Sequence, residues 1–245
     1  MSNKTPQQEF AEECQAGIDA QGDDRALCEL AQTFYNESAK HKYTYHFSWM
    51  GRPIIQLPQD MVAMQELIWQ IKPDLIIECG IAHGGSIIYY ASMMELVGHG
   101  EVLGIDRDIR AHNRDAIESH PMAKRIRMID GSSIDPAVVE QVRALAEGKK
   151  VIVVLDSNHT HEHVLAELRA YAPLTSLDSY CVVMDTVVED MPEDAFPDRP
   201  WGVGDNPRTA VWAYLKETED FVIDAAVHNK LLITVARDGY LRRVR

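Results

Sequence analysis

The sequence predicts an α/β fold: a mostly parallel seven-stranded sheet, with helices on both faces and an N-terminal helical extension. Three observations carry this prediction. Short apolar runs alternate with segments of helical periodicity, five of these runs end in a carboxylate, and two further strand-like runs close the chain. Alternating strands and helices are typical of a parallel sheet, and the closing pair would add an antiparallel edge.

Size and composition fit one large soluble domain. The chain has 245 residues, of which 46% are hydrophobic and 25% charged, and its net charge of −14 argues against broad nucleic-acid binding. Residues 1–10 are polar and unlike a signal peptide, and no apolar run reaches the roughly 20 residues of a membrane helix. The four cysteines form no C-x-x-C pair, so we expect free thiols and a cytoplasmic protein.

The chain divides into an N-terminal helical extension, residues 1–50, and a main domain, residues 51–245. Residues 1–45 are polar and predict one or two helices that pack beside the main domain. The aromatic residues near their end are expected to fill the interface or, alternatively, to wall the active site. After an extended segment at residues 53–58, apolar residues at helical spacing predict a helix that ends at Lys72-Pro73.

The main domain then alternates strands and helices. Five strands are predicted at residues 75–79, 101–105, 126–129, 151–155 and 180–184. The helices between them are predicted at residues 86–96, 111–119, 136–147 and 162–171. Residues 186–209 contain four prolines and predict a long loop of the kind that often has a function. A helix at residues 211–215 and two strands, residues 221–227 and 231–236, complete the chain.

Each of the five parallel strands ends in a carboxylate. These acids are Glu78, Asp106, Asp130, Asp156 and Asp185. The carboxyl ends of parallel strands lie on one edge of the sheet, where ligands bind. The acids are therefore expected to surround one crevice, and so much negative charge would repel itself unless cations or hydroxyl donors were bound there.

A glycine-bearing loop follows the first of these strands. Residues 75–86 read LIIECGIAHGGS, so that an acid stands at the strand end and no G-K-[ST] follows. An acid at this place suits a ligand with positive charge and hydroxyl groups better than a pyrophosphate. S-adenosylmethionine has an ammonium, a sulfonium and a ribose diol, and we predict it as the cofactor.

The residues expected to contact this cofactor come from four strand ends. Glu78 and Gly80 would bind its amino-acid end, Asp106 its ribose, and Asp130 and Ser132 would lie by the adenine. Taken singly, each acid could instead cap a helix or form a turn. The full set of candidate contacts is Glu78, Gly80, His83, Gly84, Ser86, Asp106, Asp130, Ser132 and Asp156.

A metal and a base are predicted at the ends of the fourth and fifth strands. Asp156, Asp185 and Thr186 would offer an all-oxygen site suited to Mg²⁺. A cation there would make an acceptor hydroxyl more acidic, and His159 would take its proton as the catalytic base. The alternative role of His159 is that of a packed or capping residue. A zinc site at His161 and His163 is a further alternative, although a helix from Glu162 would separate these side chains.

Several longer motifs occur in a fixed order: WMGRP at residues 49–53, PQD at 58–60, ECGIAHGGS at 78–86, DSNH at 156–159, EHV at 162–164, PWGVGDNP at 200–207 and GYL at 239–241. Together they resemble the family of cephalosporin hydroxylase and rhamnosyl O-methyltransferase. The resemblance implies a Rossmann-like class I methyltransferase fold. It also implies an S-adenosylmethionine-dependent, Mg²⁺-assisted O-methyltransferase that acts on a sugar or glycosylated small molecule.

The resemblance further implies metal ligands at Asp156 and at the end of the fifth strand, a base at His159, and assembly into oligomers. The family usually has Glu-Asp at that strand end, where this chain has Met184-Asp185, so one acidic ligand is missing. Three other functions remain open: a catechol-like small-phenol O-methyltransferase, a zinc-dependent hydrolase that uses the histidine cluster, and a cofactor-binding subunit without catalysis.

Overall fold

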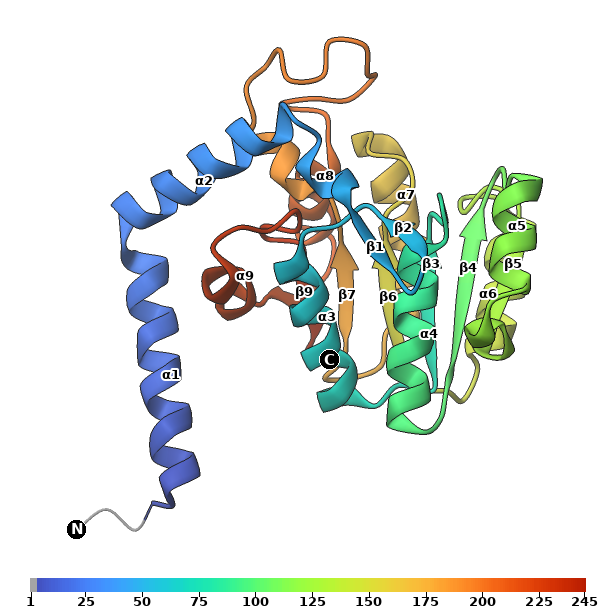
Figure 1. Ribbon diagram of the computed structural model, residues 1–245, viewed down its shortest axis with the longest axis horizontal. Helices are drawn as coiled ribbons and strands as arrows, with labels where there is room; N and C mark the ends of the chain where they lie inside the picture. The colour runs from blue at the N-terminus through green and yellow to red at the C-terminus, as the bar shows by residue number, and fades with distance from the viewer. Residues whose placement is uncertain (1–3) are drawn as a thin grey trace.

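A seven-stranded sheet forms the centre of the molecule in the computed structural model, which describes residues 4–245 (Figure 1). Its strands are β3 (Leu75–Cys79), β4 (Glu101–Asp106), β5 (Ile126–Asp130), β6 (Val151–Leu155), β7 (Tyr180–Val183), β8 (Phe221–Ile223) and β9 (Tyr240–Arg243). Their order in the sheet is β5-β4-β3-β6-β7-β9-β8. The first five strands run parallel, while β9 pairs antiparallel with both β7 and β8. The predicted fold class is confirmed.

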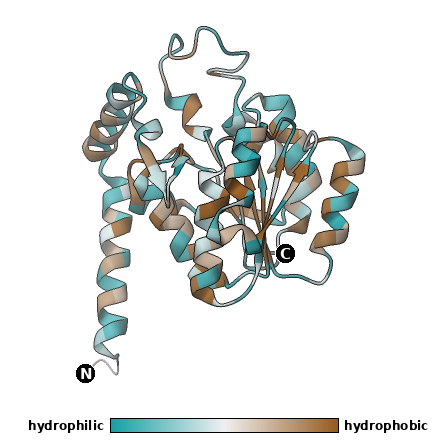
Figure 2. Ribbon diagram, turned by 45° about the vertical axis from the view of Figure 1, so that its right-hand side comes forward, coloured by the Kyte–Doolittle hydropathy of each residue, from teal (hydrophilic) through white to brown (hydrophobic). Residues whose placement is uncertain are grey.

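The buried apolar residues form two layers that the sheet separates. In β6, Ile152 and Val154 belong to one layer, and Val151, Val153 and Leu155 to the other. This division follows from the strand geometry, because successive side chains point to opposite faces. Parallel strands buried on both faces are therefore continuously apolar, as this sequence is, and Figure 2 shows the hydrophobic strands inside the body.

Helices cover both faces of the sheet. The helices of one face are α3 (Pro58–Ile71), α4 (Gly85–Val97) and α5 (Ala111–Glu118). Their apolar side chains, including Ile117, belong to one core layer. The helices of the other face are α6 (Pro136–Ala146), α7 (His161–Tyr171) and α8 (Pro207–Tyr214). They contribute Val142, Leu168 and Val211 to the other core layer. Five of these helices lie where the sequence predicts a helix, and α8 begins four residues before the one predicted at residues 211–215.

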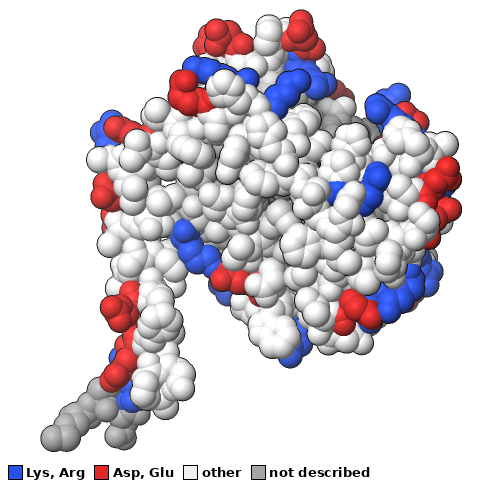
Figure 3. Space-filling model, in the orientation of Figure 1, with Lys and Arg blue, Asp and Glu red and all other residues white. Residues whose placement is uncertain are grey.

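An arm of two helices precedes the body, as predicted. It consists of α1 (Pro6–Asp23), which begins at a Thr5 capping box, and α2 (Arg25–Ala39). Among the residues that the structure describes, α1 has none that is buried. Its N-terminal part projects away from the body, with acids and bases along it (Figures 1 and 3), whereas its other end lies against residues 225–231. Its C-terminal end is attached where the Gln21 amide donates a hydrogen bond to the Asn229 carbonyl oxygen, 2.6 Å away.

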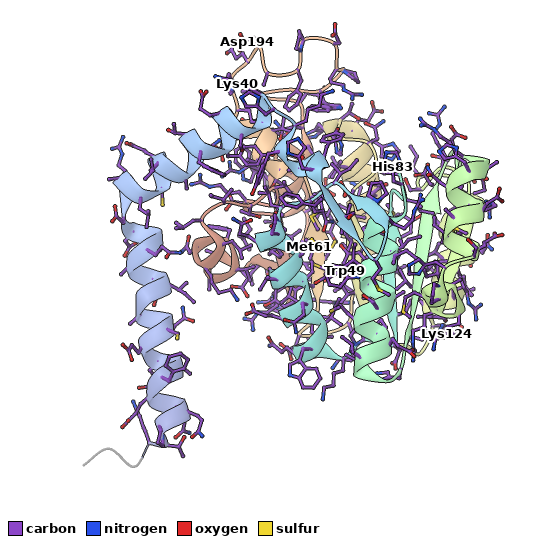
Figure 4. All side chains as sticks on the ribbon, in the orientation of Figure 1. Lys40, Trp49, Met61, His83, Lys124 and Asp194 are labelled. Atoms are coloured by element: carbon purple, nitrogen blue, oxygen red, sulfur yellow. The ribbon has the colours of Figure 1, made fainter. Side chains whose placement is uncertain are left out.

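The chain from the arm to the body runs through a short helical turn, Tyr43–His46, and a hairpin of β1 (Phe47–Trp49) and β2 (Arg52–Ile54). Trp49 lies over α4, and its indole nitrogen donates to Ser92 Oγ at 2.8 Å (Figure 4). Tyr43, Phe47 and Trp49 pack against the core layer of α3 and α4. The structure thus places these three aromatic residues in the interface, which is the first of their two predicted roles.

The predicted strand at residues 231–236 is wrong, and the one at residues 221–227 is too long. After β8 the chain forms the short helix α9 (Ala225–Leu231), and the closing strand is β9. The apolar run at residues 231–236 resembles a strand, but tertiary contacts decide its conformation. The Val235 amide donates to the Asp60 carboxylate, and the Val235 carbonyl accepts from Val187 N.

The loop predicted at residues 186–209 is shorter than expected. It begins with a helical turn, Thr186–Asp190, and ends where α8 starts at Pro207. The intervening residues extend over the carboxyl edge of the sheet and include Asp194 (Figure 4). Of the helices described in residues 4–245, none has the length and apolar character needed to cross a membrane.

Candidate active site

The candidate site lies at the carboxyl ends of β3 and β6, where the chain changes direction across the sheet. From β3 the order continues to β4 and β5 on one side, and β6 and β7 lie on the other. Ligands bind at such a switch point, because the loops after the two central strands diverge there. Along this edge the acids follow in the order Asp130, Asp106, Glu78, Asp156 and Asp185.

Two glycines allow the loops around this edge to approach one another. Gly80 has φ +101°, and a Cβ on it would lie 2.0 Å from the Asp156 carbonyl oxygen. A Cβ on Gly85 would lie 2.0 Å from the Pro53 carbonyl oxygen. Any other residue at either position would push the loop after β3 away from its neighbours. The glycines of the predicted loop therefore bring backbone segments together as well as leaving room for a ligand.

Glu78 is fully buried beside a small pocket and lacks part of its hydrogen bonding. Oε2 accepts from the Ser86 hydroxyl at 2.9 Å, but Oε1 has no partner among residues 4–245. Burial raises the pKa of Glu78 to about 8; the Ser86 hydrogen bond opposes the shift, and the charge of Asp106 adds to it. A buried acceptor without a donor costs free energy, and a ligand ammonium would remove that cost.

Gln56 lines the same pocket and was not found from the sequence. The pocket is bounded by Gln56, Gly80, Ser86 and Asp156, together with neighbouring residues of the two loops. Within the described chain, the buried Gln56 amide makes no hydrogen bond of normal geometry, although the Tyr90 hydroxyl lies near enough to interact with it. Its donor and acceptor would suit the carboxylate and ammonium of an amino-acid group. No spacing rule singles out this residue, since glutamines are common in exposed loops.

Asp106 holds the loop after β3 in place. Oδ2 accepts from the amides of Ile81 and Ala82 at 2.9 and 3.2 Å, and Oδ1 accepts from Asp108 N at 3.0 Å. A carboxylate has about four acceptor positions, so capacity remains for a ribose hydroxyl. The structure thus gives Asp106 a structural role beside its predicted ligand contact.

Arg52 and Asn113 fasten the same loop from the other side. The Arg52 guanidinium donates to the His83 carbonyl oxygen at 3.0 Å from Nε, and from Nη2 to Asn113 Oδ1 at 2.9 Å. Asn113 Nδ2 donates in turn to the Ala82 carbonyl oxygen at 2.9 Å. His83 itself lies at the carboxyl edge of the sheet (Figure 4). Its backbone is held, which leaves its half-buried side chain as the candidate for contact.

Asp130 and Ser132 lie at the edge of the crevice, two strands away from Glu78. Asp130 is exposed, and Arg114 forms an ion pair with it at 3.3 Å. Ser132 is half-buried at the turn before α6. The adjacent Ser133, which the sequence analysis overlooked, is buried and donates to the Glu167 carboxylate. The part of the crevice predicted to bind the adenine is therefore polar. Its acid, Asp130, already has Arg114 as a cationic partner.

Asp156, His159 and Asp185 meet in one cluster. One ligand atom from each lies within 4.8 Å of the others, and no other such group of metal-binding side chains occurs in the described residues. His159 Nε2 lies 3.2 Å from Asp185 Oδ2, and the His159 ring meets Trp201 edge-on at 5.2 Å. Burial raises the pKa of Asp156 well above its usual range, and the negative charges of Asp185 and Glu78 raise it further. Such a donor set fits a divalent cation.

Thr186 and Met184 do not join this cluster. The Thr186 hydroxyl is buried and donates to the Arg237 carbonyl oxygen at 2.5 Å. Met184 is 1% exposed and packs in the core layer of α3 and α4. Asp185 itself adopts φ +55°, a left-handed conformation that aspartate tolerates better than most residues. The Asp185 side chain thereby reaches His159. Its sequence neighbours do not, because Met184 packs in the core and Thr186 bonds to Arg237.

The three histidines of the sequence HTHEH have separate partners. His161 Nδ1 lies 2.8 Å from Thr209 Oγ1, and His163 Nε2 lies 3.1 Å from Ser133 Oγ. His159 is the only one of the three beside Asp185. Because they do not converge, the residues give no support to the zinc-dependent hydrolase.

Comparisons with known proteins decide the family. The family described as "Rhamnosyl O-methyltransferase/CmcI" matches residues 41–244. The chain belongs to this family. A rhamnosyl O-methyltransferase of Mycobacterium tuberculosis H37Rv is 33% identical over 231 residues, which cover 87% of this chain and 89% of that protein. The enzyme of the same name from Mycobacterium leprae is 33% identical over 200 residues, 80% of this chain and 82% of that protein.

Solved structures of low sequence identity share the fold. CmcI with Mg and SAM has a TM-score of 0.57 and 20% identity, over 82% of this chain and 78% of that chain. MycE with Mg, SAH and mycinamycin VI has a TM-score of 0.51 and 18% identity, over 86% of this chain and 54% of that chain. The resemblance stated from the motifs is thus confirmed, as is the Rossmann-like methyltransferase fold. Membership of the family also confirms the prediction of an S-adenosylmethionine-dependent O-methyltransferase.

Proposed function

We propose that this protein transfers a methyl group from S-adenosylmethionine to a hydroxyl of a sugar or glycosylated small molecule, assisted by Mg²⁺ and by His159 as base. The observation that carries the proposal is the cluster of Asp156, His159 and Asp185 beside the partly unsatisfied Glu78. The sugar rests on the relatives, which are named for rhamnosyl O-methylation. The residues present fit both cofactors, because acids without a cationic partner gather where a sulfonium compound and a divalent ion would bind.

We assign the two cofactors to neighbouring parts of the crevice. Glu78, Ser86 and Gln56 would hold the amino-acid end of S-adenosylmethionine, and Asp106 its ribose, while Asp130, Ser132, His83, Gly80 and Gly84 remain predicted contacts. Asp156 and Asp185 would hold Mg²⁺. Thr186 is retained only as a weaker candidate, because its hydroxyl is buried and directed toward the Arg237 carbonyl oxygen instead of the cluster. When bound, the ion lowers the pKa of an acceptor hydroxyl, and the sulfonium supplies an electrophilic methyl carbon.

The chain's own residues would then do three things. Asp185, whose Oδ2 lies 3.2 Å from His159 Nε2, keeps the imidazole at the cluster. His159 would take the proton of the acceptor hydroxyl, and the cofactor would supply the methyl group and depart as a neutral thioether. Trp201, which meets the His159 ring edge-on at 5.2 Å, would help to keep water from it. Most of the acceleration comes from holding nucleophile, carbon and sulfur in line.

His159→Ala tests the base. General acid–base catalysis contributes roughly 10²- to 10⁴-fold, so turnover is expected to fall by that factor while cofactor affinity changes little. The matched control is His161→Gln, because His161 is a neighbouring histidine that contacts Thr209 instead of the cluster. Turnover of His159→Ala equal to that of the control would remove the base from the proposal.

A panel of acceptors tests the substrate class. Methyl transfer from a labelled donor is measured with rhamnosides, other deoxyhexosides, and catechols. The proposal expects transfer to a sugar hydroxyl, whereas preferred transfer to catechols would favour the small-phenol alternative. The zinc-dependent hydrolase has no support from the separated histidines. The alternative of a cofactor-binding subunit without catalysis is opposed by membership of an O-methyltransferase family.

Three further assignments complete the proposal. Residues 1–50 act as an extension of a methyltransferase domain formed by residues 51–245, although the hairpin of β1 and β2 crosses that boundary. The protein works in the cytoplasm, consistent with its four free cysteines. It assembles into a homo-oligomer, which light scattering on the purified chain would test.

A further inference from the structure

The first turn of α3 contains a buried carboxylate that has no part in the reaction described above. Asp60 is 0% exposed, and it forms no ion pair with any Lys or Arg among residues 4–245. A buried charge without a cation costs free energy, so hydrogen bonds must compensate for its lost hydration. The question is which groups donate those bonds and what the bonds hold.

Three donors converge on Asp60, and two of them belong to one short segment. The Thr234 hydroxyl donates to Oδ1 and the Val235 amide to Oδ2, the latter at 2.9 Å. The Tyr240 hydroxyl donates to Oδ1 at 2.9 Å from the start of β9. Thr234 is fixed further, because its Oγ1 accepts from Ala236 N at 2.9 Å. Asp60 thus attaches residues 234–236 to the helix α3.

The same segment holds the chain immediately after Asp185. The Val187 amide donates to the Val235 carbonyl oxygen at 3.1 Å. The Thr186 hydroxyl donates to the Arg237 carbonyl oxygen at 2.5 Å and lies 3.4 Å from the Val235 carbonyl oxygen. Residues 234–237 therefore connect Asp60 on one side with Thr186 and Val187 on the other.

Asp185 depends on this support because its backbone is left-handed, which costs some free energy even for aspartate, a residue that tolerates this conformation better than most. It adopts φ +55° between a strand and a helical turn, and contacts of the next two residues help to hold it there. The next two residues are those that residues 234–237 hold. Resting on the function proposed above, we propose that Asp60 is a positioning residue for Asp185: through residues 234–237 it keeps the Asp185 carboxylate beside Asp156 and His159, where the cation binds.

Asp60→Asn is the most informative substitution. It preserves the size of the side chain and an acceptor for Thr234 and Tyr240, but it presents an NH₂ group to the Val235 amide, so that contact is lost. Outer partners of metal ligands typically contribute 10- to 100-fold to metal affinity. We therefore expect about tenfold weaker binding of Mn²⁺, used as a paramagnetic probe of the Mg²⁺ site, with cofactor affinity unchanged because Glu78 and Gln56 are not touched.

Two further variants test whether weaker Mn²⁺ binding comes from a displaced Asp185, from the lost charge of Asp60, or from a general loss of protein stability. Thr234→Val keeps the Asp60 charge but removes a donor of the connecting segment, and it should also weaken Mn²⁺ binding, by several-fold. Asp224→Asn is the matched control, since Asp224 likewise accepts from a tyrosine hydroxyl, that of Tyr180 at 2.6 Å, but at the other end of β7. This control should bind Mn²⁺ like the unaltered protein.

The experiment is electron paramagnetic resonance titration of Mn²⁺ into the full-length protein and the three variants, with calorimetric titration of S-adenosylmethionine alongside. Weaker Mn²⁺ binding by Asp60→Asn and Thr234→Val, with cofactor affinity preserved, supports the positioning role. A loss confined to Asp60→Asn would show an effect of charge and overturn it, as would unchanged affinity in both. Failure of the unaltered protein to bind Mn²⁺ would instead overturn the metal in the proposed function.

Discussion

The two sides of the crevice treat their acids differently. On the side of β4 and β5, Asp106 accepts three backbone amide hydrogen bonds and Asp130 pairs with Arg114. On the side of β6 and β7, Asp156 and Asp185 have no Lys or Arg partner in the described chain, and the central Glu78 has an oxygen without any donor.

This difference separates acids that build the site from acids that need a ligand. A carboxylate satisfied by amides or by arginine is stable without further partners, whereas clustered acids without a cation raise one another's pKa and oppose folding. Along the crevice, Glu78 and Asp156 bear that cost, and the charge of Asp185 adds to it at Asp156. The cationic groups of a donor and a divalent ion would neutralise these three residues, so substitutions here should have the largest effects on function.

Asp156→Asn should have the largest effect. It removes a half-buried carboxylate ligand of the cluster and should abolish Mg²⁺-stimulated turnover, with cofactor affinity kept within a few-fold. Burial raises the pKa of Asp156 well above its usual range, so its charged form opposes folding at neutral pH. The ligand-free variant should therefore unfold at a higher temperature than the parent protein. Turnover against Mg²⁺ concentration and thermal unfolding measure the two effects.

Full activity of this variant in the presence of a chelator would contradict the metal assignment. Lower thermal stability would contradict the claim that the cluster opposes folding. Asp205→Asn provides a control, because Asp205 accepts from the His161 amide at 2.7 Å, close to the cluster but outside it.

Glu78→Gln should have the next largest effect, and it should weaken binding of S-adenosylmethionine instead of binding of the metal. Loss of charge-assisted contacts costs about 1–3 kcal/mol, so cofactor affinity should fall roughly 5- to 150-fold. Burial raises the pKa of Glu78 to about 8, and therefore the parent protein holds a proton there at pH 7. Binding of an ammonium should release that proton. Calorimetry in two buffers of different ionisation enthalpy measures it, and Glu78→Gln should release less.

The sign of the pH dependence of folding follows from the same residue. A raised pKa means that the folded state binds the proton more tightly than the unfolded state does. The stabilisation is present below pH 4.5, the ordinary pKa, and is lost as the pH rises through about 8. The ligand-free parent protein should lose stability across that window, and Glu78→Gln should lose less. Identical pH profiles for the two proteins would place the raised pKa elsewhere.

Asp106→Asn should have a moderate effect. Its carboxylate orders the loop after β3 through Ile81 and Ala82, and an amide can accept from only one side. We expect a several-fold loss of cofactor affinity and faster hydrogen exchange at the two loop amides. Weaker cofactor binding with unchanged exchange would mean that Asp106 acts through the ligand alone.

The sequence predicted the local pattern of the body well and its long-range contacts poorly. The strand at residues 75–79 and the glycines after it follow from side-chain character and backbone freedom, which are local properties. That the run at residues 231–236 is not a strand depends on Asp60, some 170 positions earlier in the sequence. Nothing near Thr186 indicates that its hydroxyl turns to Arg237. Gln56 was missed for the same reason, because its importance appears only once its burial is known.

Asp130→Asn should have the smallest effect and tests the comparison at its weak end. Asp130 and Arg114 form a largely exposed ion pair, and such pairs contribute about 0–1 kcal/mol. Cofactor affinity should therefore change less than about fivefold, the factor that 1 kcal/mol represents. The sequence predicts Asp130 near the adenine, and a larger loss, measured by calorimetry, would establish that contact. Asp135→Asn is the control, because Asp135 is a nearby acid that caps α6 by accepting from the Ala137 amide at 2.8 Å. It would also show that an acid with an arginine partner can still serve the ligand, so that the division between the two sides of the crevice would have to be redrawn.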